Sequence, residues 1–181
     1  MRKGVLFAAL CLVTALTLAG CWSYRSLSEI AIVSGMAIDR DPAVGKYSLS
    51  FEIVDLSQTK NAGPSSKVVK SEGKTVFEAV RNAKKRLLNR LYFGNMQIVV
   101  ISEEIARNQG ISDVVDWVMR DAEGRETVNV IVFQQGDAAQ ILSMQGIDQK
   151  IVSFEIDSIV TEDNKSTSST SAIELYNVYN V

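Results

Sequence analysis

The sequence predicts a mixed α/β fold: a central mixed sheet of about four to five strands with packed helices and an N-terminal β-hairpin. Strand-like and helix-like segments alternate along the second half of the chain, which is the pattern of an α/β domain. Residues 96–101 and 128–133 are almost entirely apolar, as is typical of strands buried on both faces at the centre of a sheet. A chain of 181 residues with 46% hydrophobic residues can bury a core of this kind.

The N-terminal hairpin is predicted from two strand-like segments joined by a turn. Residues 30–38 are rich in branched apolar side chains, and residues 47–54 alternate between apolar and polar side chains. The alternation places Glu52 on the polar, outward face. Residues 39–45 contain the proline and glycine of a turn. Gly35, inside the first strand, predicts a bulge or a close backbone approach, with a ligand contact as the alternative.

A helix is predicted to follow a short edge strand at Val68 and Val69. Thr75 to Glu78 matches the capping box, in which the Thr and Glu side chains satisfy free backbone N–H groups. Apolar residues continue at helical spacing to Leu91, so we expect the helix to end at 92–95. Most of its other positions are basic. These basic residues suit a face that contacts anionic lipid or an acidic partner. The alternative is a solvated face whose charges complement the helix dipole. The residues that would form the lipid or partner face are Arg81, Lys84 and Lys85.

Three further helices are predicted around the second apolar strand. One begins after Ser102 and ends at Gly110, and another begins at Ser112. Asp137 is expected to cap a helix over residues 138–144. Residues 147–160 have a moderately helical apolar pattern.

The leader carries the clearest chemical signal. Arg2 and Lys3 precede an apolar run that ends in small residues, as in a secretory signal peptide. The run ends in a sequence that resembles the bacterial lipobox, in which the cysteine is lipidated and becomes the mature N-terminus. A single transmembrane helix is the alternative, but the run is short for a span of about 20 residues. The lipobox residues are Leu18, Ala19, Gly20 and Cys21.

The domain boundaries follow from these patterns. Trp22 and Tyr24 lie next to the anchor, where their rings suit the membrane headgroup region or, equally, packing against the domain. The abrupt end of the chain suggests that it continues in a longer protein. The expected parts are a signal peptide at 1–20, a membrane-proximal lead segment at 21–29, the α/β domain at 30–163, a polar loop at 164–171 and the start of a further segment at 172–181.

Composition excludes most catalytic and metal chemistry. The chain has no histidine, and its two cysteines are Cys11 in the leader and Cys21, which removes most zinc sites, any disulfide inside the folded part and any Ser-His-Asp triad. A net charge of −2 argues against a nucleic-acid partner. Asp39 and Asp41 could begin a calcium site, but no side-chain ligands follow, and a turn explains them. Glu103-Glu104 is explained by the start of a helix. We therefore expect no catalytic residue, no metal and no cofactor except a covalent lipid on Cys21.

Four segments resemble one family. They are Cys21 to Leu27 followed by Glu29 to Asp39, Glu72 to Ala79, Leu91 to Gln97, and Val118 to Glu123. In this order they are similar to the spore germination lipoproteins, the C subunits of the Ger-type germinant receptors of endospore-forming bacteria. The resemblance extends to about Met144. Members commonly carry Asp where Ser23 stands and His where Asn95 stands, so any role of that histidine is inapplicable here.

The resemblance implies a lipid-anchored, non-enzymatic subunit needed for nutrient-triggered germination. It implies two integral-membrane partners, the A and B subunits, and a location outside the cytoplasm at the inner membrane of the spore. It also implies a larger protein of which this chain is the N-terminal domain.

Two other classes of function stay open. A stand-alone solute-binding lipoprotein would need a deep cleft with convergent polar groups, usually between two domains. An exported carboxylate-dependent hydrolase would need two acidic side chains in one pocket, within about 5–10 Å of each other.

Overall fold

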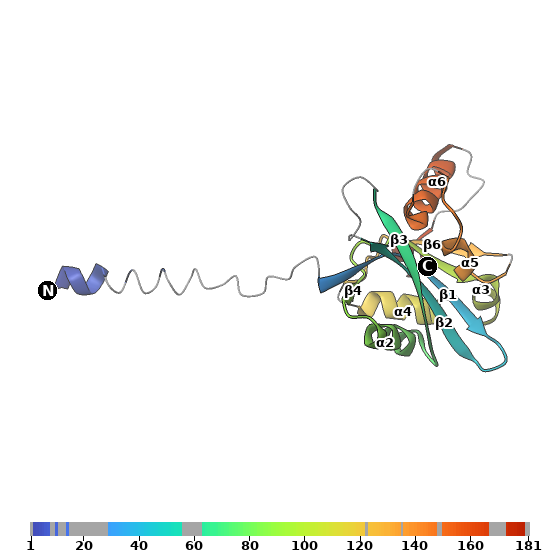
Figure 1. The fold of residues 1–181 in the computed structure, drawn as a ribbon, viewed down its shortest axis with the longest axis horizontal. Coiled ribbons are helices and arrows are strands. Elements are labelled where there is room, and N and C mark those ends of the chain that lie inside the picture. Colours follow the sequence, from blue (N-terminus) through green and yellow to red (C-terminus); the bar gives the residue numbers. More distant parts are fainter. Residues whose placement is uncertain are drawn as a thin grey trace.

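The mixed α/β fold is confirmed by the computed structural model, whose main body is a seven-stranded mixed sheet with helices against it (Figure 1). The structure describes residues 2–7, 10, 14, 29–55, 63–121, 123–134, 136–147, 150–166 and 173–179. The strands are β1 (Ile30–Asp41), β2 (Lys46–Asp55), β3 (Ser65–Gly73), β4 (Arg90–Tyr92), β5 (Ile98–Ser102), β6 (Asn129–Phe133) and β7 (Ile173–Glu174). The helices after residue 29 are α2 (Val76–Arg86), α3 (Glu103–Asn108), α4 (Ser112–Arg120), α5 (Ala139–Leu142), α6 (Val152–Ser166) and α7 (Leu175–Tyr179).

Strand β1 is the centre of the sheet. The strand order is β3-β2-β1-β5-β6-β7, and β4 also pairs with the start of β1. The predicted hairpin of β1 and β2 is antiparallel, whereas β1, β5 and β6 are parallel. All five residues of β5 are buried, as predicted. The same prediction for residues 128–133 is wrong: β6 lies next to the edge strand β7, which is two residues long, and only Val130 of β6 is buried. The sheet has more strands than expected because β4 and β7 are too short to produce a periodic pattern.

The larger core lies between the sheet and helices α2 and α4, on one face of the sheet (Figure 1). Phe93 lies at its centre, with its ring edge-on to Trp117 at 5.0 Å and to Phe51 at 6.1 Å between ring centroids. Tyr47 joins β2 to α4, because its hydroxyl donates a 2.6 Å hydrogen bond to Asp113 Oδ2. Burial and this hydrogen bond raise the pKa of Tyr47 to about 12.

The capping box of α2 is confirmed, but the predicted end of the helix is wrong. Glu78 N donates to Thr75 Oγ1 at 3.1 Å, and the Glu78 carboxylate accepts from Lys74 N at 2.7 Å. The helix ends at Arg86, not at 92–95. Leu91 lies in β4, which pairs with β1, and its side chain is buried there. Leu88 is fully exposed. The spacing of apolar residues could not show where α2 ends and β4 begins. Leu91 is buried in the strand, but its position also fits the apolar stripe of the helix.

The predicted cap of α5 is also wrong. The N-cap position is Ala138, and the side chain of Asp137 makes no capping hydrogen bond. The backbone N–H groups of Ala138 and Ala139 instead donate to the carboxylate of Asp39, at the far end of β1. Further along the chain, α6 continues to Ser166, three residues into the segment expected to be a polar loop. Helix α7 lies in the segment expected to start a further helix-like element.

Both predictions for Gly35 are confirmed, a bulge and a close approach. The register of β1 against β2 shifts between Val33 and Gly35. A Cβ atom at Gly35 would overlap the Ser153 hydroxyl and lie 2.8 Å from the Ser153 Cβ. The start of α6 therefore packs directly on the backbone of β1.

We predict that Gly35→Ala destabilises the fold by about 1–3 kcal/mol, because the added methyl group pushes α6 off the sheet. Urea unfolding measures the change. Gly35→Ala combined with Ser153→Gly should lose less than the two single variants added together, because the second change restores space. Wild-type stability in Gly35→Ala would contradict the close approach.

Candidate functional site

The second face of the sheet, covered by α5 and the first turns of α6, holds two buried carboxylates. The alternation in β2 predicted an outward, solvated position for Glu52, and this is wrong: its residue exposure is 0%. Asp39 is 9% exposed on the same face. Burying a carboxylate costs free energy unless hydrogen bonds satisfy it. The hydrogen-bond partners of these two side chains therefore show which parts of the structure they stabilise.

Glu52 accepts five hydrogen bonds from three segments of the chain. Val152 N and Ser153 N, at the start of α6, each donate at 2.9 Å, one to each carboxylate oxygen, and the Ser153 hydroxyl adds a further short contact. The hydroxyls of Ser34 in β1 and Ser66 in β3 donate at 3.0 and 2.6 Å. The free N–H groups at a helix N-terminus favour a negative charge. Glu52 is therefore the cap of α6, supplied from a strand 100 residues earlier.

Asp39 does the same for α5. Its two carboxylate oxygens accept from Ala138 N at 2.6 Å and from Ala139 N at 3.0 Å. Burial raises the pKa of Asp39 above 3.8, and the two backbone N–H groups oppose this effect. Because its pKa is raised in the folded state, the contribution of Asp39 to stability is greatest below pH 3.8 and is lost as the pH rises through the raised pKa.

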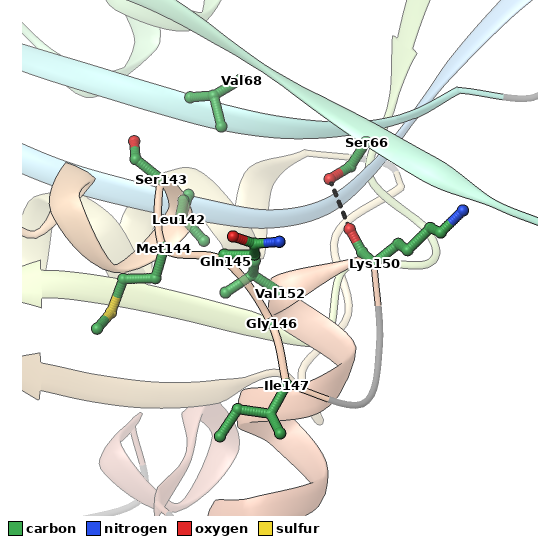
Figure 2. A pocket seen from close by; sticks show the side chains of 10 residues that line it. All are labelled: Ser66, Val68, Leu142, Ser143, Met144, Gln145, Gly146, Ile147, Lys150 and Val152. Atoms are coloured by element: carbon green, nitrogen blue, oxygen red, sulfur yellow. Dashed lines mark hydrogen bonds between the residues drawn. The ribbon is translucent and has the colours of Figure 1, made fainter.

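A pocket of about 620 Å³ lies beside the Glu52 network, between β3 and the connection from α5 to α6. Figure 2 shows Ser66 and Val68 of β3 on one side and the chain from Leu142 to Ile147 on the other. The Ser66 hydroxyl, which donates to Glu52, also lies 3.4 Å from the carbonyl oxygen of Lys150. We call this the connector pocket; it is lined by Ser66, Val68, Leu142, Ser143, Met144, Gln145, Gly146, Ile147, Lys150 and Val152.

The connector pocket has the surface chemistry of a contact site. Met144 and Ile147 are 61% and 90% exposed, which leaves two large apolar side chains in water at its rim. Two carboxylates border it: Glu52 has both oxygens committed to backbone and hydroxyl donors, and Glu155 accepts from Ile147 N at 2.9 Å. Among the described residues no group of acidic side chains could hold a metal ion. Exposed apolar side chains at the edge of a hollow are typical of contact surfaces, and the carboxylate of Glu52 beside it holds the fold together.

The predicted anchor residues cannot be placed. Leu18, Ala19, Gly20, Cys21, Trp22 and Tyr24 all lie outside the described residues. Within the part of the chain that the structure describes, no helix is both long enough and apolar enough to cross a membrane.

The predicted basic face is present on α2, but its three members differ. Arg81 and Lys85 are exposed. Lys84 folds back on the domain, with its Nζ 3.9 Å from Asp121 Oδ2 and 5.7 Å from the centre of the Phe93 ring. Lys84 is therefore partly a structural residue.

Sequence patterns did not identify Glu52 and Asp39 as the residues that organise this face. Their hydrogen-bond partners are about 100 positions away, so no local sequence pattern indicates these interactions. One weak signal was available: Ser34 and Ser153, which supply hydroxyl donors to Glu52, lie among apolar residues in β1 and at the start of α6.

Comparison with known proteins places the chain among spore germination proteins. Residues 23–181 match the family model described as the spore germination protein N-terminal domain. The chain is 33% identical over 164 residues to Spore germination protein KC of Bacillus subtilis (strain 168), covering 86% of this chain and 40% of that protein. It is 27% identical over 139 residues to Spore germination protein B3 of the same organism, covering 75% and 36%. No solved structure matches the chain.

We predict that Glu52→Ala destabilises the domain by about 3 kcal/mol or more, because it leaves two buried N–H groups and three hydroxyls without their acceptor. Glu72→Ala, which removes an exposed carboxylate from the neighbouring strand β3, is the matched control and should cost about 0.5 kcal/mol or less. Urea unfolding of both variants measures the difference. Equal, small effects would show that Glu52 does not hold α6.

Proposed function

The chain belongs to the family of spore germination protein N-terminal domains, and from this premise we propose that it is a lipid-anchored, non-enzymatic subunit of a spore germinant receptor. In this proposal Cys21 carries the lipid, the domain lies outside the cytoplasm at the inner membrane of the spore, and two integral-membrane subunits, A and B, are its partners. The observation that carries the proposal is the family match over residues 23–181.

The relatives support a role in germination. Both are named spore germination proteins, and the chain spans about 40% or less of their length. We propose that this chain acts in the same process as part of a longer protein. The nutrient that triggers the response is then recognised by the assembled receptor.

The leader supports the lipid anchor. Residues 2–20 have the charge, apolar run and small residues of a signal peptide, and Cys21 follows in a lipobox. Covalent lipid on Cys21 would be the only non-protein group. Stable anchoring by lipid takes more than one acyl chain or an added basic surface, and an S-lipidated, N-acylated cysteine supplies more than one chain.

The second face of the sheet supports a non-enzymatic role. Glu52 is the fully buried carboxylate of this face, and its two oxygens accept five hydrogen bonds from the chain. A general base needs a free lone pair directed at its substrate. We propose that the connector pocket, with Met144 and Ile147 at its rim, contributes to contacts within the receptor.

We predict that Cys21→Ala releases the protein from the membrane and abolishes or strongly reduces the germination response to nutrient. Cys11→Ala, in the apolar run of the leader, is the matched control and should leave both unchanged. Membrane retention is measured by fractionation of spores, and germination by the fall in optical density after nutrient is added.

Three outcomes decide between the parts of this proposal. Unchanged retention and response in Cys21→Ala would contradict the lipid anchor. Isolation of the wild-type protein from detergent extracts as a lone species, without two polytopic membrane proteins, would contradict the receptor complex. Clear, saturable binding of a nutrient to the domain alone, measured by calorimetry, would favour a solute-binding lipoprotein.

A further inference from the structure

We propose that the end of α2 and the loop after it form a docking surface for an anionic lipid bilayer. We call this surface the basic corner; it consists of Arg81, Lys85, Arg86 and Leu88. The proposal rests on the lipid anchor at Cys21 proposed above, and it adds a second, non-covalent contact that sets the orientation of the domain on the membrane.

The first observation is an apolar side chain placed entirely in water. Leu88 has a relative exposure of 105%, the highest of the large hydrophobic residues among those described. It lies in the short connection between α2, which ends at Arg86, and β4, which begins at Arg90. A leucine at the tip of a turn has no packing role in the domain, and insertion into the boundary between lipid headgroups and acyl chains would bury it.

The second observation is the charge around Leu88. Arg81 and Lys85 lie one helical turn apart on α2, on the side opposite its buried residues, and both are exposed. Arg86 is the last residue of the helix and is also exposed. In the described part of the chain these three cations have no ion pair, whereas the neighbouring Lys84 and Arg90 are paired with Asp121 and Glu123. Three unpaired cations beside an exposed apolar residue suit anionic headgroups.

The third observation is the position of the basic corner next to the start of β1. Arg90 pairs with Ile30, the first residue of β1, so the basic corner adjoins the point where the chain enters the domain from its N-terminal side (Figure 1). Leu88 is two residues from Arg90, which places it within about 12 Å of Ile30. Ile30 is nine positions after Cys21, so a lipid on Cys21 holds Ile30 within about 32 Å of the bilayer. The basic corner is therefore closer to the anchor than the hairpin turn at 42–45, which lies at the other end of β1.

These observations favour a bilayer over an acidic protein as the occupant. A tether this short keeps the bilayer at high effective concentration next to the corner, whichever protein partners are present. The corner also combines a protruding leucine with long, flexible cationic side chains, which suits a fluid surface.

The test uses the lack of free thiols in the mature lipoprotein. Cys21 is lipidated and Cys11 leaves with the signal peptide, so Leu88→Cys introduces a single reactive thiol for a polarity-sensitive fluorophore. Val44→Cys, 62% exposed in the hairpin turn at the other end of β1, is the matched control. Both lipoproteins are purified from membranes and reconstituted into vesicles of phosphatidylcholine alone or of phosphatidylcholine with phosphatidylglycerol.

We expect the label at position 88, and not at position 44, to shift to shorter wavelength and to lose access to an aqueous quencher on the anionic vesicles. The shift should disappear in about 1 M salt, where charges are screened within about 3 Å. It should also disappear in Arg81→Gln/Lys85→Gln/Arg86→Gln. The charge-matched control, Lys46→Gln/Lys67→Gln/Lys74→Gln, removes three exposed cations elsewhere and should keep the shift.

Flotation of the same vesicles separates the two proposals. Protein that floats while the label at 88 stays aqueous overturns the docking surface and leaves the anchor standing. If Cys21 carries no lipid, Cys21→Ala is added so that position 88 stays the single thiol, and a shift on anionic vesicles then supports the docking surface and overturns the anchor. Protein that neither floats nor shifts overturns both.

Discussion

The buried carboxylate of Glu52 is the interaction on which the second face of the domain depends. One side chain in β2 accepts hydrogen bonds from β1, β3 and the start of α6. Its partners explain other features of the sequence. Gly35 is required because α6 comes too close to β1 for a side chain, and the bulge beside Gly35 accompanies the turn of Ser34 toward Glu52. The connector pocket exists because α6 is held at this distance from β3.

Local patterns in the sequence predicted the elements that are stabilised locally. The hairpin, the buried strand β5, the N-terminal cap of α2 and the apolar side of α4 follow from alternation, hydrophobic runs and capping residues. The end of α2 was wrong because Leu91 fits a helical stripe and is buried in a strand. Glu52 and Asp39 were missed because their partners are brought together only by the tertiary fold. An anchor at Cys21 could be predicted from sequence because the lipobox is a linear motif, and it stays a prediction.

The membrane contact and the receptor contact that we propose lie on different faces of the domain. The face with α2 and α4 carries the larger core and, at the end of α2, the basic corner beside the point where the chain enters. The opposite face carries the Glu52 network and the connector pocket. A lipid anchor and a membrane-docking corner would fix the orientation of the domain, so that the connector pocket is presented to the rest of the receptor in a constant direction.

Native-state hydrogen exchange of the Val152 and Ser153 amides tests the central claim most directly. The first N–H groups of a helix have no partner within the helix and exchange fast unless something caps them. If Glu52 holds α6, these two amides exchange only when the whole domain unfolds, at a free energy close to that of β5. Exchange of both amides as fast as that of the exposed loop residue Gly110 would show that α6 is not held by Glu52 and would contradict the account.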